Sequence, residues 1–406
     1  MPPKSLASLV DCDPFPFYES LRARGPVVWD DEMEAWLVTS HEACEFVQRR
    51  EDLFAAPWPE LGVEKIFGRR GLFLLRGEQH RRLYTEVNRF FRPQVMREYQ
   101  QAFVRPLVAD RIARFSKRGR ADIAAEFADE IPVRVIGQML GVPWQDEDFA
   151  QRCWKATEGF LRQTAASILP TPTPADYEAG VRSTQELNAL LEPVVAAALA
   201  GDVGGTNYAV ELWRAGRELF DDWSEEDVLD HCRFLFLAGM FTVSESICNG
   251  VYLLVSDPDL QERLAADVDA LVPKFAEEVL RLSPPLHLRL RIATTTTDLA
   301  GMVVAPGDRV CTVTAAAGRD PARYEEPDRV APERPRASGH LAFNKGPRFC
   351  SGAPLARVEL TEAFAAVVTS LPDLALDPAG PEPTLRGFVQ RGYKPLHVTF
   401  RTHAAA

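Results

Sequence analysis

The start of the sequence lacks a hydrophobic segment long enough to cross a membrane. Residues 1–25 contain neither a run of roughly 20 apolar residues nor the basic-then-apolar pattern of a signal peptide. Positive charge is also in deficit, because 46 Lys and Arg stand against 58 Asp and Glu, which gives a formal net charge of −12. These absences predict a cytoplasmic protein that contacts no membrane and does not take nucleic acid as its main partner.

Cysteine is sparse and scattered. The seven cysteines stand at positions 12, 44, 153, 232, 248, 311 and 350, and no two of them form a C-x-x-C pair. A disulfide framework and a zinc site are therefore not expected. Most of these thiols are predicted to be small buried apolar residues.

No internal repeat or linker-like segment divides the chain. Although 406 residues could form two or three domains, apolar residues make up 46% of the chain and are spread from end to end. We therefore expect a single domain, residues 1–406, that is mainly α with a smaller β-rich portion. The helical bulk is predicted over approximately 78–282 and 353–370, and the β-rich parts over approximately 25–75, 286–315 and 375–402.

The longest predicted helix runs from Ser224 to about Ser256, and Ser224 with Asp227 forms a capping box at its start. About 33 residues at 1.5 Å each would span roughly 50 Å, so this helix should cross the whole molecule. Its middle contains Ala238 and Gly239, and a helical glycine costs about 1 kcal/mol relative to alanine. Either a flat ligand or a closely packed neighbouring helix would explain the missing side chain.

One cysteine lies in a setting that favours a thiolate. Cys350 precedes a predicted helix and follows a glycine-containing loop within residues 343–357. Backbone N–H groups and a helix N-terminus favour negative charge there, which lowers the pKa of a thiol. Gly346 and Gly352 let the backbone approach a flat ligand closely, and Phe343 can shield the sulfur from water. From these residues alone, either a reactive thiol or a metal thiolate is expected.

This segment resembles the haem-binding signature of the cytochrome P-450 haem-thiolate monooxygenases. The signature positions are matched by Phe343, Gly346, Arg348, Cys350 and Gly352, whereas Asn344 replaces a usual glycine. The resemblance covers nearly the whole chain. It implies the cytochrome P-450 fold with a long central helix over the haem. It also implies haem b as cofactor, with Cys350 as the iron ligand, in an enzyme of the bacterial soluble class.

A second match lies on the helix predicted before residue 286. Glu278 and Arg281 form the family's E-x-x-R, and their i, i+3 spacing puts both side chains on one helix face. Arg334 stands where the third member of this set is expected. Because a carboxylate can bind two guanidiniums at once, the resemblance implies a structural lock between this helix and the irregular loop before Cys350.

The long helix carries the family's oxygen-binding pattern with one departure. Ala238, Gly239 and Thr242 match that pattern. The resemblance implies that Ala238 and Gly239 leave room for oxygen and substrate, and that the Thr242 hydroxyl manages protons. Phe241 occupies the place of the usual acid, so protons need another route. Glu245, one turn further along the same face, or a chain of solvent waters would have to supply them.

Four residues match positions that bind the haem carboxylates in the family. Arg291 and Arg348 match two basic positions, and His80 matches a third. Tyr84 stands where the family usually has Arg, and its phenol can still donate one hydrogen bond. The resemblance therefore implies that these four residues bind the cofactor together with the Cys350 loop.

By analogy with the family, separated apolar segments should line a substrate pocket over the haem. Such a pocket suits a small apolar or aromatic substrate. The expected pocket residues are Phe234, Met240, Phe241, Leu286, His287, Leu288 and Phe388. His287 is the only ionisable residue among them and could orient a polar group of the substrate.

Positive charge is expected on the thiolate side of the molecule, from Lys345, Arg348 and Arg357, joined by Arg81 and Arg82. On an otherwise acidic protein, such a face would suit an acidic electron donor. The chain shows no flavin or iron–sulfur module of its own. The resemblance therefore implies NAD(P)H as the source of electrons, delivered through a reductase and a ferredoxin.

Together these residues predict a haem-thiolate monooxygenase that uses dioxygen and two electrons to hydroxylate or otherwise oxidise a small organic substrate. Phe241 keeps a first alternative open, in which the same fold performs coupling, ring closure, dehydration or a peroxide-driven oxidation. The second alternative is a haem-binding or recruitment protein without oxygenase activity. Thr242 and the complete Cys350 loop count against that second alternative.

Overall fold

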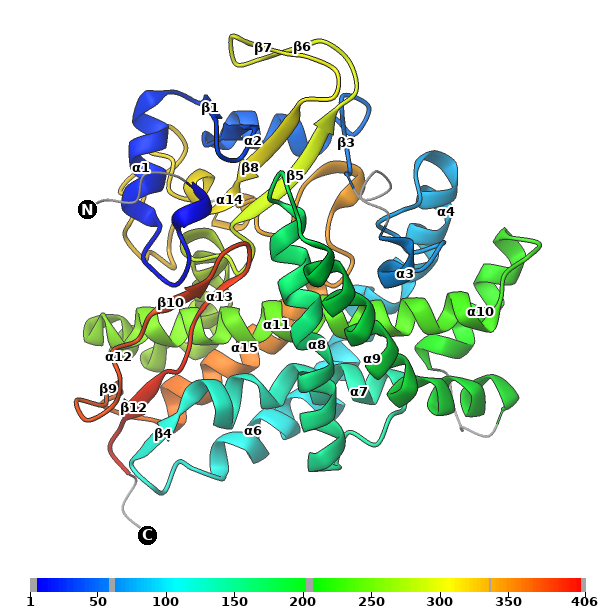
Figure 1. Cartoon of the computed structure of the whole chain (residues 1–406). Coiled ribbons are helices and arrows are strands. Elements are labelled where there is room, and N and C mark those ends of the chain that lie inside the picture. The colour runs from blue at the N-terminus through cyan, green and yellow to red at the C-terminus, as the bar shows by residue number, and fades with distance from the viewer. Residues whose placement is uncertain (1–5, 58–62, 202–206, 336, 403–406) are drawn as a thin grey trace.

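Helices dominate the molecule, and the strands form smaller sheets that gather mainly on one side (Figure 1). The computed structural model describes residues 6–57, 63–201, 207–335 and 337–402. The chain is mainly α with a smaller β-rich part, which confirms the fold class expected from the sequence.

The α-helices of the described chain are α1 (Phe15–Arg24), α2 (His41–Arg49), α3 (Glu64–Phe67), α4 (Gly77–Asn88), α5 (Pro93–Tyr99), α6 (Arg105–Ala113), α7 (Glu130–Leu140), α8 (Glu147–Ser167), α9 (Pro174–Ala200), α10 (Tyr208–Leu219), α11 (Glu225–Val255), α12 (Pro258–Ala266), α13 (Val268–Leu282), α14 (Thr314–Ala317) and α15 (Ala353–Ser370). The strands are β1 (Val27–Asp30), β2 (Ala35–Val38), β3 (Phe54–Ala55), β4 (Arg120–Asp122), β5 (Leu288–Ala293), β6 (Thr297–Leu299), β7 (Met302–Val304), β8 (Arg309–Val313), β9 (Ala375–Leu376), β10 (Leu385–Gly387), β11 (Arg391–Tyr393) and β12 (His397–Thr399).

The largest sheet has five strands in the order β1-β2-β8-β5-β3. Its strands β2 and β8 pair in parallel, with Ala35 opposite Arg309, so the sheet joins the beginning of the chain to its last third. The smaller sheets are β10-β11, β4-β12-β9 and β6-β7. Helices α2 and α3 lie inside the first predicted β-rich part, and β4 lies inside the predicted helical bulk. That strand depends on pairing with β12, which is remote in sequence.

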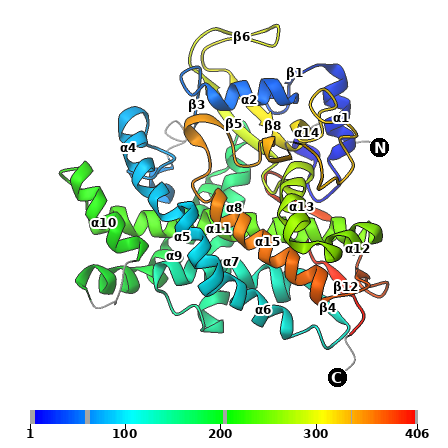
Figure 2. The same cartoon turned by 180° about the vertical axis from the view of Figure 1, so that it is seen from behind.

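Helix α11 crosses the molecule from one side to the other and is visible behind the other helices from both directions (Figure 1, Figure 2). The predicted capping box is present at its start, where the Ser224 Oγ accepts from the Asp227 N–H at 3.3 Å and the Asp227 carboxylate accepts from the Ser224 N–H at 2.9 Å. By length and composition α11 could also cross a membrane. However, 72% of its most apolar window is buried inside the fold, as in the core helix of a soluble protein.

The main hydrophobic core surrounds α11 and joins it to helices from both ends of the chain. Leu237, Ile247 and Val251 of α11 belong to the same buried cluster as Leu360 and Phe364 of α15. Because α11 and α15 pack together, the middle of α11 and the loop that precedes α15 are held in fixed positions relative to each other. These two segments carry the candidate site.

Candidate active site

The loop before α15 holds Cys350 by backbone hydrogen bonds. The Cys350 N–H donates to the Phe343 carbonyl at 2.9 Å, and the Phe349 N–H donates to the Gly346 carbonyl at 3.1 Å. At the helix end, the Ala353 N–H donates to the Cys350 carbonyl at 3.2 Å. The sulfur is therefore presented at the N-terminus of α15, as the sequence predicted.

Cys350 differs from the other six cysteines in its surroundings. Five of the seven are buried and Cys12 is half-buried, whereas Cys350 is exposed. The surrounding protein raises the pKa of the Cys350 thiol, while the N–H groups of Gly352 and Ala353 and the Arg289 guanidinium act in the opposite direction by stabilising the thiolate. A bound cation would complete this environment, because metal coordination deprotonates a thiol outright.

The backbone of the loop explains two of its residues. Gly346 has φ 68°, and a Cβ added there would lie 2.8 Å from the Arg49 Cα. Asn344, the departure from the family signature, has φ 63°, a conformation that Asn tolerates better than most residues. Gly352 has an ordinary φ of −77°, and an added Cβ there would meet only the Cys350 Sγ, at 3.9 Å.

Replacing Gly346 with alanine is expected to destabilise the protein more than replacing Gly352. At Gly346 the left-handed backbone alone costs about 1–2 kcal/mol for an L-residue, and the contact with Arg49 adds to this cost. Urea unfolding of the two variants measures the difference. Equal losses of unfolding free energy would contradict this account of the loop.

A cluster of positive side chains lies close to the loop. Arg348 donates to the Glu51 carboxylate at 2.8 Å and to the carbonyls of Leu72 and Leu75 at 2.5 and 2.6 Å. Burial lowers the pKa of Arg289 to about 10, and burial with repulsion from Arg289 and Arg348 lowers that of Arg291 to about 10 as well.

Glu51, which pairs with Arg348, is the carboxylate that the described chain places beside the guanidiniums of Arg289, Arg291 and Arg348. The Arg289 Nη1 is buried and has no hydrogen-bond partner in the described chain. A buried charged donor without a partner is costly. The cluster therefore suits a ligand that carries carboxylates.

His80 and Tyr84 lie one turn apart on α4 and stack on each other, with 5.3 Å between ring centroids. Burial and the nearby Arg348 lower the pKa of His80 to about 4, so its imidazole is neutral. The Tyr84 hydroxyl donates to the Phe349 carbonyl at 2.6 Å. In this structure Tyr84 thus supports the Cys350 loop, and its expected hydrogen bond to the cofactor stays a prediction.

The middle of α11 has an open face within an otherwise buried helix. Ala238 is exposed and Thr242 is half-buried, whereas Met240 and Val243 are buried. The Thr242 hydroxyl donates to the Ala238 carbonyl at 2.8 Å. Gly239 faces the neighbouring helix α7, because an added Cβ would lie 2.5 Å from the Ile136 Cδ1. Helix packing therefore explains Gly239, and the open face is left to Ala238 and Thr242.

The remaining aromatic and apolar candidates on α11 lie on different sides of it. Phe234 is half-buried and packs edge-on against Phe73, with 4.8 Å between ring centroids. Phe241 packs edge-on against Trp154 of α8 at 4.8 Å. Met240 is fully buried in the main core. Since Met240 lies about 200° around the helix from Ala238, the structure does not bring it to the open face.

A pocket of about 500 Å³ lies between the end of α8 and the β10–β11 hairpin. Its apolar walls include Leu161, Ala165, Leu169, Phe388 and Val389, together with Ala7 and Val10 from the N-terminal segment. Glu245 of α11 and Lys394 also line it. Of the predicted pocket residues, Phe388 is the one that borders this space.

Residues 286–288 are not among the lining residues of this pocket, but they lie directly behind it. Leu286 and Leu288 belong to the same apolar cluster as Phe388 and Val389, and Leu286 pairs with Gln390 of the lining. His287 is fully buried and packs against Phe15 and Tyr18 of α1, with its Nδ1 3.1 Å from the Tyr18 hydroxyl. Burial holds the pKa of His287 well below its usual value. Contrary to the expectation from the sequence, His287 serves the contact with α1, and Leu286 and Leu288 pack beside it.

Comparison with known proteins identifies the family. A family model described as cytochrome P-450 matches residues 214–391. The cytochrome P-450 monooxygenase PikC of Streptomyces venezuelae is 32% identical over 395 residues, which cover 92% of this chain and 89% of that protein. The chain belongs to the cytochrome P-450 family. Mycinamicin IV hydroxylase/epoxidase of Micromonospora griseorubida is 31% identical over 90% of each chain.

The fold agrees with that identification. The cytochrome P-450 enzyme CYP109B1 from Bacillus subtilis superimposes with a TM-score of 0.78 at 25% sequence identity, covering 96% of this chain and all of the other. The protein is therefore a cytochrome P-450 monooxygenase, an oxidoreductase that binds haem and receives electrons from an external redox partner.

The residues present fit a haem in this P-450. The exposed Cys350 thiol could bind the haem iron, the unpartnered Arg289 Nη1 would suit a haem carboxylate, and Ala238 is exposed on α11. Sequence reasoning missed Arg289 although it had named Arg291. The i, i+2 spacing of the two residues on β5 was the available signal, since it places both on one face of a strand.

In the E-x-x-R set of this P-450, Glu278 and Arg281 are fully buried and Arg334 is partly buried. Arg281 donates to both oxygens of Glu278 at 2.7 and 2.9 Å, and to the carbonyls of Gly318, Pro327 and Arg329 at 2.6 to 3.0 Å. Arg334 reaches the Glu278 carboxylate at 3.4 Å. The predicted link is thus present: α13 is fastened to the irregular chain that leads to Cys350.

Proposed function

We propose that this P-450 inserts one oxygen atom of dioxygen into a small, mostly apolar organic molecule, most simply by C–H hydroxylation. The observation that carries this proposal is the exposed Cys350 thiol at the N-terminus of α15. Helix α15 packs on α11, the helix that bears the open face of Ala238 and Thr242. The apolar lining of the neighbouring pocket supports an apolar substrate. In this proposal the whole chain acts as one catalytic domain.

In the mechanism we propose, haem b supplies the oxygen-activating chemistry, which a thiolate ligand promotes by pushing electron density onto iron. Cys350 holds the iron, and Phe343, Gly346 and Gly352 shape the loop around its sulfur. His80, Arg289, Arg291 and Arg348 bind the haem carboxylates. On the distal side, Ala238 leaves room for oxygen and substrate, and the Thr242 hydroxyl holds the water that passes protons inward.

We further propose that electrons come from NAD(P)H through a reductase and a ferredoxin, in the cytoplasm. An acidic donor would dock on the side of Cys350, where Arg81 and Arg82 of α4 are exposed and Lys345 is half-buried. Two residues expected on this face contribute less than the sequence suggested. Arg348 is partly buried and paired with Glu51, and Arg357 is paired with Glu277 at 2.6 Å.

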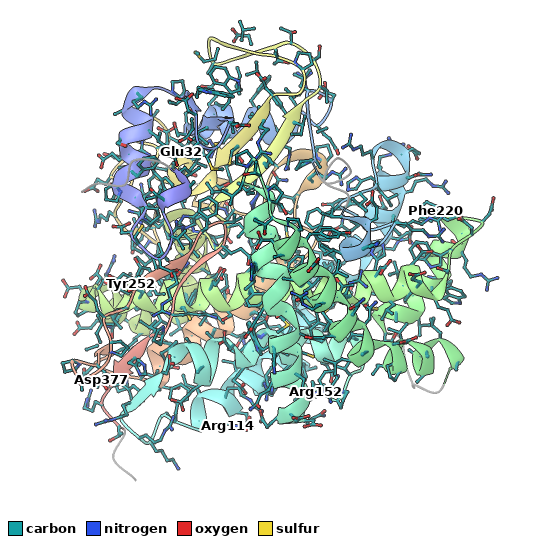
Figure 3. All side chains as sticks on the ribbon, in the orientation of Figure 1. Glu32, Arg114, Arg152, Phe220, Tyr252 and Asp377 are labelled. Atoms are coloured by element: carbon teal, nitrogen blue, oxygen red, sulfur yellow. The ribbon has the colours of Figure 1, made fainter. Side chains whose placement is uncertain are left out.

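Replacing Arg82 with glutamate is expected to slow ferredoxin-driven turnover by roughly three- to tenfold at low salt, because reversing a rim charge weakens electrostatic steering. The difference should shrink as salt is added. The control is Arg152→Glu, at the lower end of α8, on the side away from the main sheet (Figure 3). Equal effects of the two variants on the reduction rate, followed by stopped-flow absorbance, would contradict the docking face.

The function is tested by reconstitution with NADPH, a plant-type ferredoxin and its reductase. A compound library is first screened for substrate-induced low-to-high-spin shifts of the haem. Compounds that bind are then incubated with the complete system, and hydroxylated product is counted against NADPH consumed. Binding without any oxygenated product, in protein that accepts electrons, would refute the proposed activity.

A further inference from the structure

We propose that the Glu245 carboxyl is the proton donor to the Thr242 site in this P-450, in place of the acid that Phe241 displaces. The inference rests on the monooxygenase function proposed above. It concerns a residue that lies in the pocket lining and that the mechanism has not yet used.

Glu245 is placed next to Thr242 by the helix itself. Residues three apart on an α-helix are neighbours on one face, with about 5–6 Å between their Cβ atoms. Strand β11 covers the Glu245 stem on the other side, since a Cβ added at Gly392 would lie 2.8 Å from the Glu245 Cγ. The carboxyl is thereby held on the face of α11 that also carries Ala238 and Thr242.

The Glu245 carboxyl is buried, and one of its two oxygens has no hydrogen-bond partner among the described residues. Glu245 is 8% exposed, and the unpaired oxygen is Oε2. A buried polar atom left unpaired costs free energy. Because Glu245 lines the 500 Å³ pocket, a water in that pocket can complete the missing bond. In this proposal that water is the bridge to the Thr242 hydroxyl, which lies one turn back on α11.

A polar network next to Glu245 can return protons to it. The Lys394 ammonium donates to the Asp129 carboxylate at 2.5 Å and to the Ser244 hydroxyl at 2.8 Å, and Ser244 in turn donates to Asp129. The side chains of Lys394 and Asp129 are 25% and 28% exposed, so the network reaches solvent. Lys394 also lines the same pocket as Glu245.

The packing of Phe241 against Trp154 separates position 241 from the polar network. The Phe241 ring packs against Trp154, and the Lys394 ammonium lies 5.3 Å from the Trp154 ring centroid on a cation–π contact. Trp154 thus contacts both Phe241 and Lys394. The polar groups meet α11 one turn later, at Ser244 and Glu245.

Burial raises the pKa of Glu245 to about 8, which Lys394 opposes and Asp129 reinforces. The other titratable or charged groups that face it are the Cys248 thiol on α11 and the pocket residues Arg162, Asp176 and Arg386. The carboxyl is therefore protonated at neutral pH, and its pKa lies close to the value that suits a general acid.

In each transfer the Glu245 O–H bond breaks and the proton passes through the bridging water toward the Thr242 hydroxyl. The resulting Glu245 carboxylate is reprotonated from solvent through the hydrogen-bonded network of Lys394, Ser244 and Asp129. Two such transfers accompany the two electrons that the redox partner supplies.

The test compares Glu245→Gln with wild type. Glutamine keeps the shape of the side chain but has no acidic proton. With 7-ethoxycoumarin as probe and the NADPH, ferredoxin and reductase system, we expect about a tenfold fall in dealkylated product per NADPH, with more hydrogen peroxide released. The dissociation constant of the probe, measured by its spin shift, should stay within about twofold.

Glu359→Gln is the matched control. Glu359 on α15 is also a buried carboxyl whose Oε2 has no partner among the described residues, and burial raises its pKa well above the usual value, but it does not line the pocket of Glu245. This control should leave product per NADPH unchanged. Adding Phe241→Asp to the Glu245→Gln variant returns an acid to the position before Thr242 and should restore part of the coupling.

A second readout does not depend on turnover. Because the pKa of Glu245 is raised in the folded state, the folded protein binds more protons than the unfolded chain between about pH 4.5 and about pH 8, and wild type loses stability as pH rises through that window. The melting temperature of Glu245→Gln relative to wild type should therefore increase with pH across it.

Unchanged product and peroxide yields in Glu245→Gln would overturn the proposal. A weaker probe affinity with unchanged product per NADPH would overturn it as well, and would make Glu245 a substrate anchor. If wild type forms no product although it binds the probe and consumes NADPH, the monooxygenase proposal fails. In that case a melting difference that does not change with pH would separately show that Glu245 holds no proton.

Discussion

Replacing Cys350 with serine is expected to abolish monooxygenase activity and the strongly red-shifted Soret band of the ferrous–carbon monoxide form. A serine hydroxyl keeps its proton in a site where the surrounding protein already raises the pKa of the native thiol, and its oxygen lacks the electron donation of a thiolate. Loss of the ligand itself should exceed the roughly 100-fold that removal of an outer-shell partner costs. The carbon monoxide spectrum and the product yield measure both effects.

The matched control for this change is Cys12→Ser. Cys12 is the other cysteine that is not fully buried, and it lies in the N-terminal segment away from the Cys350 loop. Its variant should keep the wild-type carbon monoxide spectrum. If the serine variant at Cys350 retained the red-shifted band while the protein stayed folded, another group would have to be the ligand.

Replacing Glu278 with alanine is expected to lower the free energy of unfolding by about 3–5 kcal/mol, because it leaves the fully buried Arg281 charge without its carboxylate. The Ala331 N–H, which donates to Glu278 at 2.9 Å, and Arg334 would lose a partner as well. Urea unfolding gives the change in free energy. The haem content of the purified variant shows whether the loop before Cys350 still forms.

The control for this prediction is Glu326→Ala, which removes an exposed ion pair. Glu326 pairs with Arg329 at 2.9 Å, but both side chains are more than 60% exposed. Such a surface pair contributes about 0–1 kcal/mol. If the two variants lost the same stability, Glu278 would not be the lock between α13 and the chain that follows it.

The elements that could be predicted from the sequence are those with local signals. The start of α11 was predicted by Ser224 and Asp227, whose side chains satisfy the first backbone N–H groups of the helix. Helix α15 was predicted over the residues it occupies, since it begins beside Gly352 and ends before Leu371. The Cys350 loop was predicted because each of its special residues lies within a few positions of the cysteine.

The positions that could not be predicted depend on partners remote in the chain. His287 is fixed by Tyr18, which lies 269 residues earlier, and Tyr84 is fixed by a carbonyl 265 residues later. No pattern among neighbouring residues predicts a partner so far away in the sequence. Met240 is different, since its place follows from helix geometry: a residue two positions beyond Ala238 points to the other side of α11.

Ala7 and Val10 line the pocket of about 500 Å³, so the N-terminal segment forms part of its wall. Arg391, fully buried, fixes that segment by donating to the carbonyls of Leu9 and Cys12. An affinity tag fused close to Ala7 and Val10, usually regarded as harmless in expression work, would therefore alter the shape of this pocket. Compound screens on such proteins would report the selectivity of a remodelled enzyme.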